Sequence, residues 1–192
     1  MSSIHKRFLC LTSLFLIAVA SFGQDVPQGV NYKKASPETN AKAKAALERA
    51  LADSNPPAAL LSGDAISCGP ILWSDLEKEH DALSKDSTPV DMFLSVPDPV
   101  QAQGRGFRTQ EQRERFWKVV LDRHPDLRNG VVRPARANEI QFYWATIPFD
   151  IEEPFFAIET SKNVFVVNLK MERDAPVLFW MDRVDDLRKL KK

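Results

Sequence analysis

The last third of the chain changes its apolar period, and this change restricts the possible folds more than any other feature of the sequence. Before Pro125 the apolar residues recur at helical spacing, whereas after the turn residues Asn129 and Gly130 they alternate or form short apolar runs. A period of two is typical of strands, because successive side chains of a strand point to opposite faces. The sequence predicts strands at Val131 to Ala137, Glu139 to Phe149, Pro154 to Thr160, Asn163 to Met171 and Val177 to Val184.

The connections between these predicted strands are short. Only Ser161 to Asn163 separate the runs PFFAIET and VFVVNLKM, and such a loop joins antiparallel neighbours rather than parallel ones. Helical patterns occupy the N-terminal half. We therefore expect an α+β fold, in which N-terminal helices pack on a curved antiparallel β-meander of four to five strands.

Two of the predicted helices have clear start signals. Ser36 can cap a helix with Pro37 at its first position, and this helix should end near Asp53. Thr109 and Gln112 have the spacing of a capping box, and the helix that follows should end near Arg123. Its predicted buried stripe consists of Phe116, Trp117, Val120 and Leu121.

Another helix is indicated between these two. Gly69-Pro70 and the capping-box pair Ser74 and Glu77 both signal a start, and the predicted apolar face contains Leu72, Leu76, His80 and Leu83. The segment 84–107 contains prolines and the sequence GRG, so we expect a long ordered loop or a boundary between two parts of one domain, with a short strand only within 90–96.

The N-terminus has the layout of a secretory signal peptide. Lys6 and Arg7 precede the apolar run 8–20, and small residues follow it. This run of about 13 residues is shorter than the roughly 20 that a spanning helix needs. We expect a signal peptide at 1–23, a flexible lead-in at 24–35 and a single domain at 36–192, secreted or periplasmic, with no membrane span after cleavage.

The charge balance excludes a general affinity for nucleic acids. The chain has 26 basic and 26 acidic residues, and loss of Lys6 and Arg7 with the leader makes the net charge −2. Binding to nucleic acids normally requires a basic excess on one face.

Cys68 is the only cysteine outside the predicted leader. It could be a nucleophile, half of an intermolecular disulfide, or a buried thiol that packs as a small apolar group. A nucleophile needs a nearby base. His80 would lie roughly 18 Å along the same helix, at about 1.5 Å per residue, and His124 lies at the end of another helix. We favour the buried thiol and assign no catalytic residue.

No metal or cofactor site is predicted. Glu77, His80 and Asp81 lack the His-Glu-x-x-His spacing of a helical zinc site, and Asp122, His124 and Asp126 form only a loose group. No phosphate-binding loop or nucleophile elbow is present.

Aromatic residues occur on both faces of the predicted strands. If Ile140, Phe142 and Trp144 pack under the helices, Tyr143 and Phe156 face away from them and become the candidate ligand-binding residues. We expect a secreted or periplasmic, non-catalytic binding or interaction domain, whose partner is a small apolar ligand or another protein. The alternatives are an extracytoplasmic hydrolase with an unrecognised active site and a purely structural component of the cell envelope.

Overall fold

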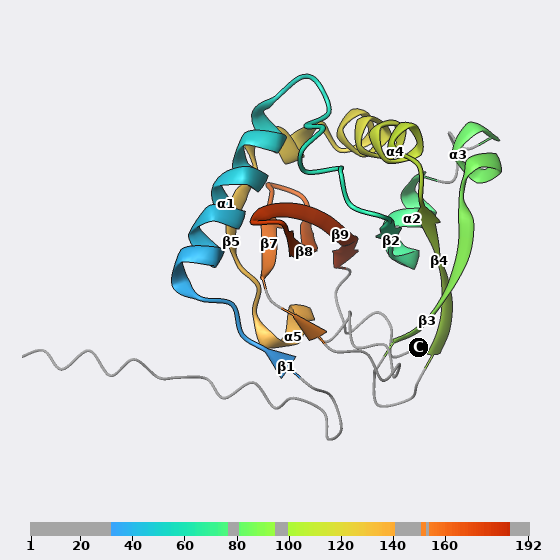
Figure 1. Ribbon diagram of the computed structural model, residues 1–192. Coiled ribbons are helices and arrows are strands. Elements are labelled where there is room, and N and C mark those ends of the chain that lie inside the picture. The colour runs from blue at the N-terminus through green and yellow to red at the C-terminus, as the bar shows by residue number, and fades with distance from the viewer. Residues whose placement is uncertain (1–31, 77–80, 95–99, 141–150, 153, 185–192) are drawn as a thin grey trace, which may run out of the picture.

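The computed structural model describes residues 32–76, 81–94, 100–140, 151–152 and 154–184 (Figure 1). In chain order its elements are β1 (Tyr32–Lys33), α1 (Pro37–Ala52), β2 (Ile66–Cys68), α2 (Pro70–Leu76), α3 (Asp81–Asp86), β3 (Thr88–Leu94), β4 (Val100–Phe107), α4 (Gln110–Arg123), the 3-10 helix η2 (Pro125–Asn129), β5 (Val131–Pro134), α5 (Ala137–Ile140), β6 (Ile151–Glu152), β7 (Phe155–Glu159), β8 (Val164–Glu172) and β9 (Ala175–Val184).

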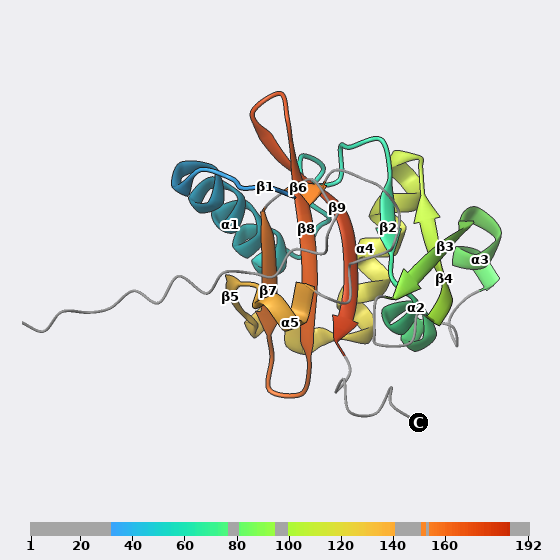
Figure 2. The ribbon, with the colours of Figure 1, turned by 90° about the horizontal axis from the view of Figure 1, so that it is seen from below.

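Seven strands form the main sheet, in the order β3-β4-β2-β9-β8-β7-β5 (Figure 2). β2 runs parallel to β9, and all other neighbours in this sheet are antiparallel. The α+β class is confirmed. The sheet, however, is mixed and larger than the expected meander of four to five strands, because β2, β3 and β4, which precede α4 in the chain, extend the meander of β7, β8 and β9.

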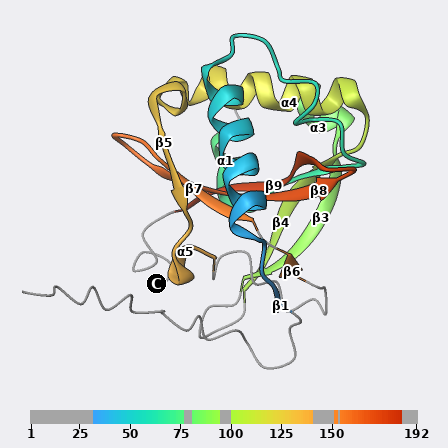
Figure 3. The same ribbon diagram turned by 60° about the vertical axis from the view of Figure 1, so that its left-hand side comes forward.

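Residues of the helices α1, α2 and α4 share one core with the sheet. Figure 3 shows α4 on one side of the sheet and α5 and β6 on the opposite side. The main core, which the sheet shares with α1, α2 and α4, includes Leu47 of α1, Leu72 of α2, Trp117 of α4, and Phe165 and Leu178 of the sheet. Among the described residues, no helix is long and apolar enough to cross a membrane.

The first and last of the predicted helices form where the capping signals place them. At the start of α1, the Ser36 hydroxyl accepts a hydrogen bond from the backbone N–H of Thr39 at 3.1 Å. At the start of α4, Thr109 and Gln112 make both bonds of the capping box. The predicted stripe of α4 is buried, so these two local predictions are confirmed.

Arg113 belongs to the buried face of α4, although the sequence pattern places it among the exposed charges. Its guanidinium donates to the carbonyl oxygens of Leu61 at 2.7 Å and Asp64 at 3.1 Å. The buried charge therefore satisfies backbone carbonyls of the loop before β2 and attaches that loop to α4.

The middle helix begins at Pro70, and the predicted capping box at Ser74 is wrong. Ser74 lies inside α2, where its hydroxyl donates to the carbonyl of Ile71 at 2.7 Å. Leu72, Leu76 and Leu83 are buried as predicted, the last of them in the separate helix α3. Glu77 and His80 lie outside the described residues.

The segment predicted as a long loop contains the hairpin of β3 and β4. Gly104 and Gly106 lie within β4. A Cβ atom at Gly104 would overlap the backbone carbonyl oxygen of Cys68 on β2, and one at Gly106 would come close to the side chain of Val90 on β3. The two glycines thus allow neighbouring strands to approach closely, a use of glycine in strands that a turn-based interpretation misses.

The predicted strand at Glu139 to Phe149 begins instead as the short helix α5, which contains Glu139 and Ile140. The remaining positions of that prediction, including Phe142, Tyr143 and Trp144, lie outside the described residues. The preceding strand is also shorter than expected, because β5 ends at Pro134.

The hairpin between β8 and β9 has a two-residue loop without glycine. Glu172 pairs with Ala175, and the loop residues Arg173 and Asp174 have φ values of 47° and 65°. Such loops require left-handed conformations, which cost side-chain-bearing residues more than glycine.

Asp174→Gly should therefore raise the free energy of unfolding by about 0.5–1 kcal/mol, because glycine adopts this conformation without steric cost. Urea denaturation at pH 7 measures the change. The control, Glu172→Gly in the adjacent ladder, should lower stability. A loss of stability in both variants would contradict the left-handed loop.

Candidate functional site

A β-bulge at Phe179 determines which side chains of β9 face each side of the sheet. Asn168 of β8 pairs with Trp180, but the next residue, Leu169, pairs with Leu178, so Phe179 is the extra residue on β9. Leu178 and Met181 both belong to the main core. The bulge consequently places the neighbouring residues Phe179 and Trp180 together on the opposite side.

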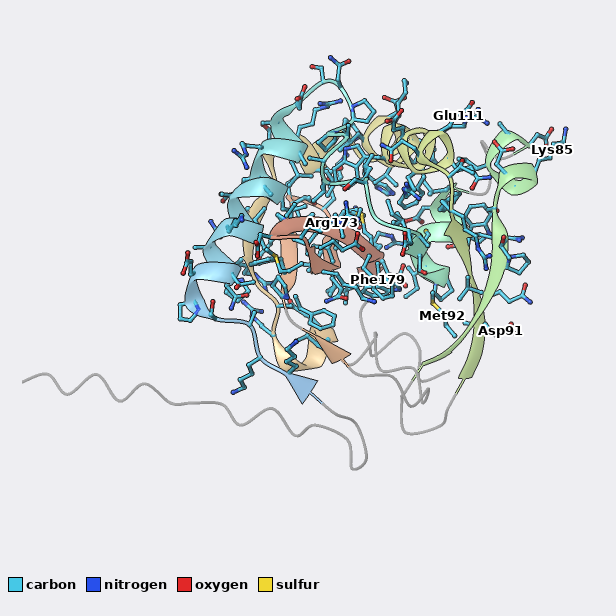
Figure 4. The ribbon with its side chains drawn as sticks, in the orientation of Figure 1. Lys85, Asp91, Met92, Glu111, Arg173 and Phe179 are labelled. Atoms are coloured by element: carbon cyan, nitrogen blue, oxygen red, sulfur yellow. The ribbon has the colours of Figure 1, made fainter. Side chains whose placement is uncertain are left out.

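A second apolar cluster forms on that opposite side, and we call it the second-face cluster. Its buried members come from α5 and from the three central strands: Ile140, Phe155, Val166 and Trp180. Partly buried side chains surround them: Met92, Ala135, Phe179 and Val184. Figure 4 shows Phe179 and Met92 on the side of the sheet away from α4.

Lys170 adds a positive charge at the edge of this cluster. Its Nζ atom lies 3.5 Å from the centroid of the Phe179 ring, a cation–π contact. Within the part of the chain that the structure describes, no carboxylate forms an ion pair with Lys170. Phe179, Met92 and Lys170 thus combine apolar surface with an ammonium group that has no counter-charge there.

The two residues predicted to bind a ligand have different outcomes. Tyr143 lies outside the described residues. Phe156 is 2% exposed and lies in the main core, opposite Val167, so it faces the helices rather than away from them. The predicted orientation of the β7 side chains was therefore wrong by one residue. Phe155, rather than Phe156, faces away from the helices and joins the second-face cluster.

The position of α5, which carries Ile140 to the second-face cluster, depends on a buried ion pair. The guanidinium of Arg133 donates to both carboxylate oxygens of Glu139, at 2.8 and 2.7 Å, and to Glu159 at 2.8 Å. Burial acts to raise the pKa of Glu139, but the bonds from Arg133 and from the Arg136 N–H outweigh it, so this pKa lies below its ordinary value.

A second candidate site is the group of polar residues where α2, α4 and β9 meet. The guanidinium of Arg183 binds both carboxylate oxygens of Asp75, through Nε to Oδ2 and through Nη2 to Oδ1 at 3.0 Å. His124 Nε2 lies 3.5 Å from the same Asp75 Oδ2. Burial lowers the pKa of His124, although the charges of Asp75 and Asp126 act in the other direction.

The sequence offered no indication of this group, because its members come from three separate elements. His124 was predicted to lie at the end of a helix, and it is the C-cap residue of α4. The chain turn at that helix end brings it to the side chains of α2 and β9. The ring of His124 also meets Phe165 edge-on, with the centroids 5.0 Å apart.

Asp182 connects β9 to the start of α2. One of its oxygens, Oδ1, accepts hydrogen bonds from the N–H groups of Leu72 at 2.6 Å and Arg183 at 2.8 Å. Gly69 precedes the helix, and a Cβ atom there would overlap the Asp182 carboxyl. Burial raises the pKa of Asp182 to about 7, against the effect of these donors and of the Ile71 N–H.

Cys68 is a free thiol and is completely buried, which confirms the packing role favoured from the sequence. Its Sγ atom contacts the carbonyl oxygen of Gly69 at 3.5 Å. Burial raises the pKa of Cys68 well above its ordinary value, and the charges of Asp182 and Asp75 raise it further. These surroundings disfavour the thiolate, which is the form that a cysteine nucleophile requires.

Within the described ranges, no group of three or more His, Cys, Asp and Glu residues could hold a metal ion. The loose group considered from the sequence is divided between two sets of contacts. Asp122 pairs with Lys118 on α4, whereas His124 lies against Asp75.

No family model, no curated protein and no solved structure matches this chain.

Arg133→Met should lower the free energy of unfolding by about 1–3 kcal/mol at pH 7, because the buried Glu139 carboxylate loses its main partner. Since the folded pKa of Glu139 lies below its unfolded value of 4.5, the stabilisation is present above pH 4.5 and is lost as the pH falls through the folded value. Urea denaturation at pH 7 and at pH 3 measures both effects.

The control for this experiment is Lys162→Met, which removes a cation from the exposed loop between β7 and β8. It should change stability by less than about 0.5 kcal/mol at either pH. Equal effects of the two substitutions would show that the Arg133–Glu139 pair does not stabilise α5.

Proposed function

We propose that this protein is a non-catalytic binding domain that acts outside the cytoplasm, in the periplasm or after secretion. Its contact surface is the partly exposed part of the second-face cluster, formed by Phe179 and Met92 together with Lys170. The ligand is a small apolar molecule, or a partner protein, that presents apolar surface next to an anionic group.

The bulge at Phe179 is the observation that supports this proposal. In a regular ladder, neighbouring residues point to opposite faces, so Phe179 and Trp180 would be separated. With the bulge, Trp180 is buried in the second-face cluster, and Phe179 lies partly exposed on the same side of the sheet. Bulges commonly direct a side chain towards a functional surface.

Charge complementarity supports the anionic part of the ligand. Lys170 is held over the Phe179 ring, and none of the carboxylates that the structure describes pairs with it. An ammonium at the edge of apolar surface can neutralise a carboxylate, sulfonate or phosphate whose apolar portion covers Phe179.

The polar group around Asp75 offers less support for the alternative of a hydrolase. Arg183 and Asp75 bind each other, and the thiol of Cys68 is buried with a raised pKa. These side chains act on one another, whereas an active site needs them directed towards a substrate.

The location outside the cytoplasm is supported by the leader pattern at residues 1–23, where Lys6 and Arg7 precede the apolar run.

Titration with anilinonaphthalene sulfonate tests the proposal, because this probe joins an aromatic surface to an anion. The folded protein should bind it saturably, and Phe179→Ala should weaken binding at least tenfold, in line with an aromatic anchor. Lys170→Gln should weaken it about fivefold, and the effect should disappear at high salt.

The matched control is Val131→Ala on the edge strand β5. Val131 is 66% exposed and is not a member of the second-face cluster, so its truncation removes exposed apolar surface outside that cluster. Wild-type affinity is expected for this variant. Equal affinity in all four proteins, or no saturable binding to the folded chain, would refute the proposed contact surface.

A further inference from the structure

The carboxyl of Asp182 is almost completely buried, at 1% exposure, and its two oxygens have unequal surroundings. Oδ1 receives the N–H groups of Leu72 and Arg183. Oδ2 lies against Gly69 and has no hydrogen-bond partner. An ionised carboxylate in this position would leave one charged oxygen without a donor and without water, which is unfavourable in a protein interior.

We propose that Asp182 is a pH-sensitive latch between α2 and the sheet, closed when its carboxyl is protonated and weakened when it ionises. The latch goes beyond the proposed binding function and does not depend on it. Oδ1 can hold the first turn of α2 in both protonation states. Ionisation adds a buried charge that is relieved when the start of α2 separates from β9 and admits water.

The charged and titratable groups around this carboxyl come from each element packed against it. Arg183 is the next residue on β9, Asp75 lies on α2, and Cys68 lies on β2. The Arg183 charge favours ionisation, and its guanidinium is bound to Asp75. On β4, Arg105 stacks over Trp73 at 5.0 Å. Val166, the β8 residue opposite Asp182, carries no charge.

The direction of the pH effect follows from the burial of the acid. The pKa of Asp182 is raised from 3.8 to about 7, so its contribution to stability is complete below pH 3.8 and is lost as the pH rises through 7. The lowered pKa of His124 has the opposite effect, because its contribution is lost as the pH falls below 6.5. A variant that keeps His124 and removes only the carboxyl of Asp182 separates the pH effects of these two residues.

The experiment compares the full chain with Asp182→Asn, in which the amide oxygen can still accept from Leu72. Urea denaturation from pH 5 to pH 8 should show the unfolding constant of the wild type rising at least tenfold relative to the variant. Hydrogen exchange of the segment 69–76 is compared between the two proteins at each pH. The ratio of the wild-type rate to the variant rate should increase from pH 5 to pH 8. Asp122→Asn, at an exposed position on α4, should behave as the wild type.

The latch would be overturned if the unfolding constants of wild type and Asp182→Asn changed equally with pH and if hydrogen exchange of α2 were the same in both proteins. If Asp182→Asn does not fold, the wild type alone decides the question through carbon-13 NMR of its aspartate carboxyls. One buried aspartate titrating above pH 6 is the expected result, and titration of every aspartate below pH 5 would overturn the proposal.

Discussion

The ladder between β8 and β9, with its bulge at Phe179, determines which side chains of β9 face the main core and which face the second-face cluster. Up to the bulge, Leu178 faces the helices, and after it Met181 does so again. Without the extra residue, every side chain on one side of that point would face the wrong layer. The bulge therefore allows one strand to contribute to the main core and to place two adjacent aromatic residues on the second face.

The same strand also attaches the helices at its C-terminal end. Asp182 binds the first turn of α2, and Arg183 binds Asp75 farther along that helix, close to His124 at the end of α4. Two neighbouring residues of β9 thus hold α2 through a buried acid and a partly buried ion pair. This arrangement explains why polar residues are buried beside a core that is otherwise apolar: they satisfy helix N–H groups and each other.

Features with a local cause could be predicted from the sequence. The caps at Ser36 and Thr109 lie within three residues of the groups they bind, and β7, β8 and β9 form at apolar runs joined by short loops. The hairpin of β3 and β4 was missed because Gly104 and Gly106 allow the close approach of the neighbouring strands β2 and β3, and in the sequence alone such glycines resemble a turn signal.

Features that depend on pairing could not be predicted. The cap of α2 comes from Asp182, which is 110 residues away from Leu72 along the chain. The bulge exists only in relation to β8, so the run LFW in β9 does not reveal that Phe179 and Trp180 share a side. The facing of Phe156 was wrong for a related reason, since a period of two defines which residues share a face but not which face is covered.

The register of the central ladder is the most direct test of this account, and cross-strand nuclear Overhauser effects measure it. The account predicts contacts that place Asn168 opposite Trp180 and Leu169 opposite Leu178, with the Lys170 side-chain protons shifted upfield by the Phe179 ring. Contacts that place Leu169 opposite Phe179 would mean a regular ladder. In that case Phe179 and Trp180 would face opposite layers, and the proposed contact surface would not exist.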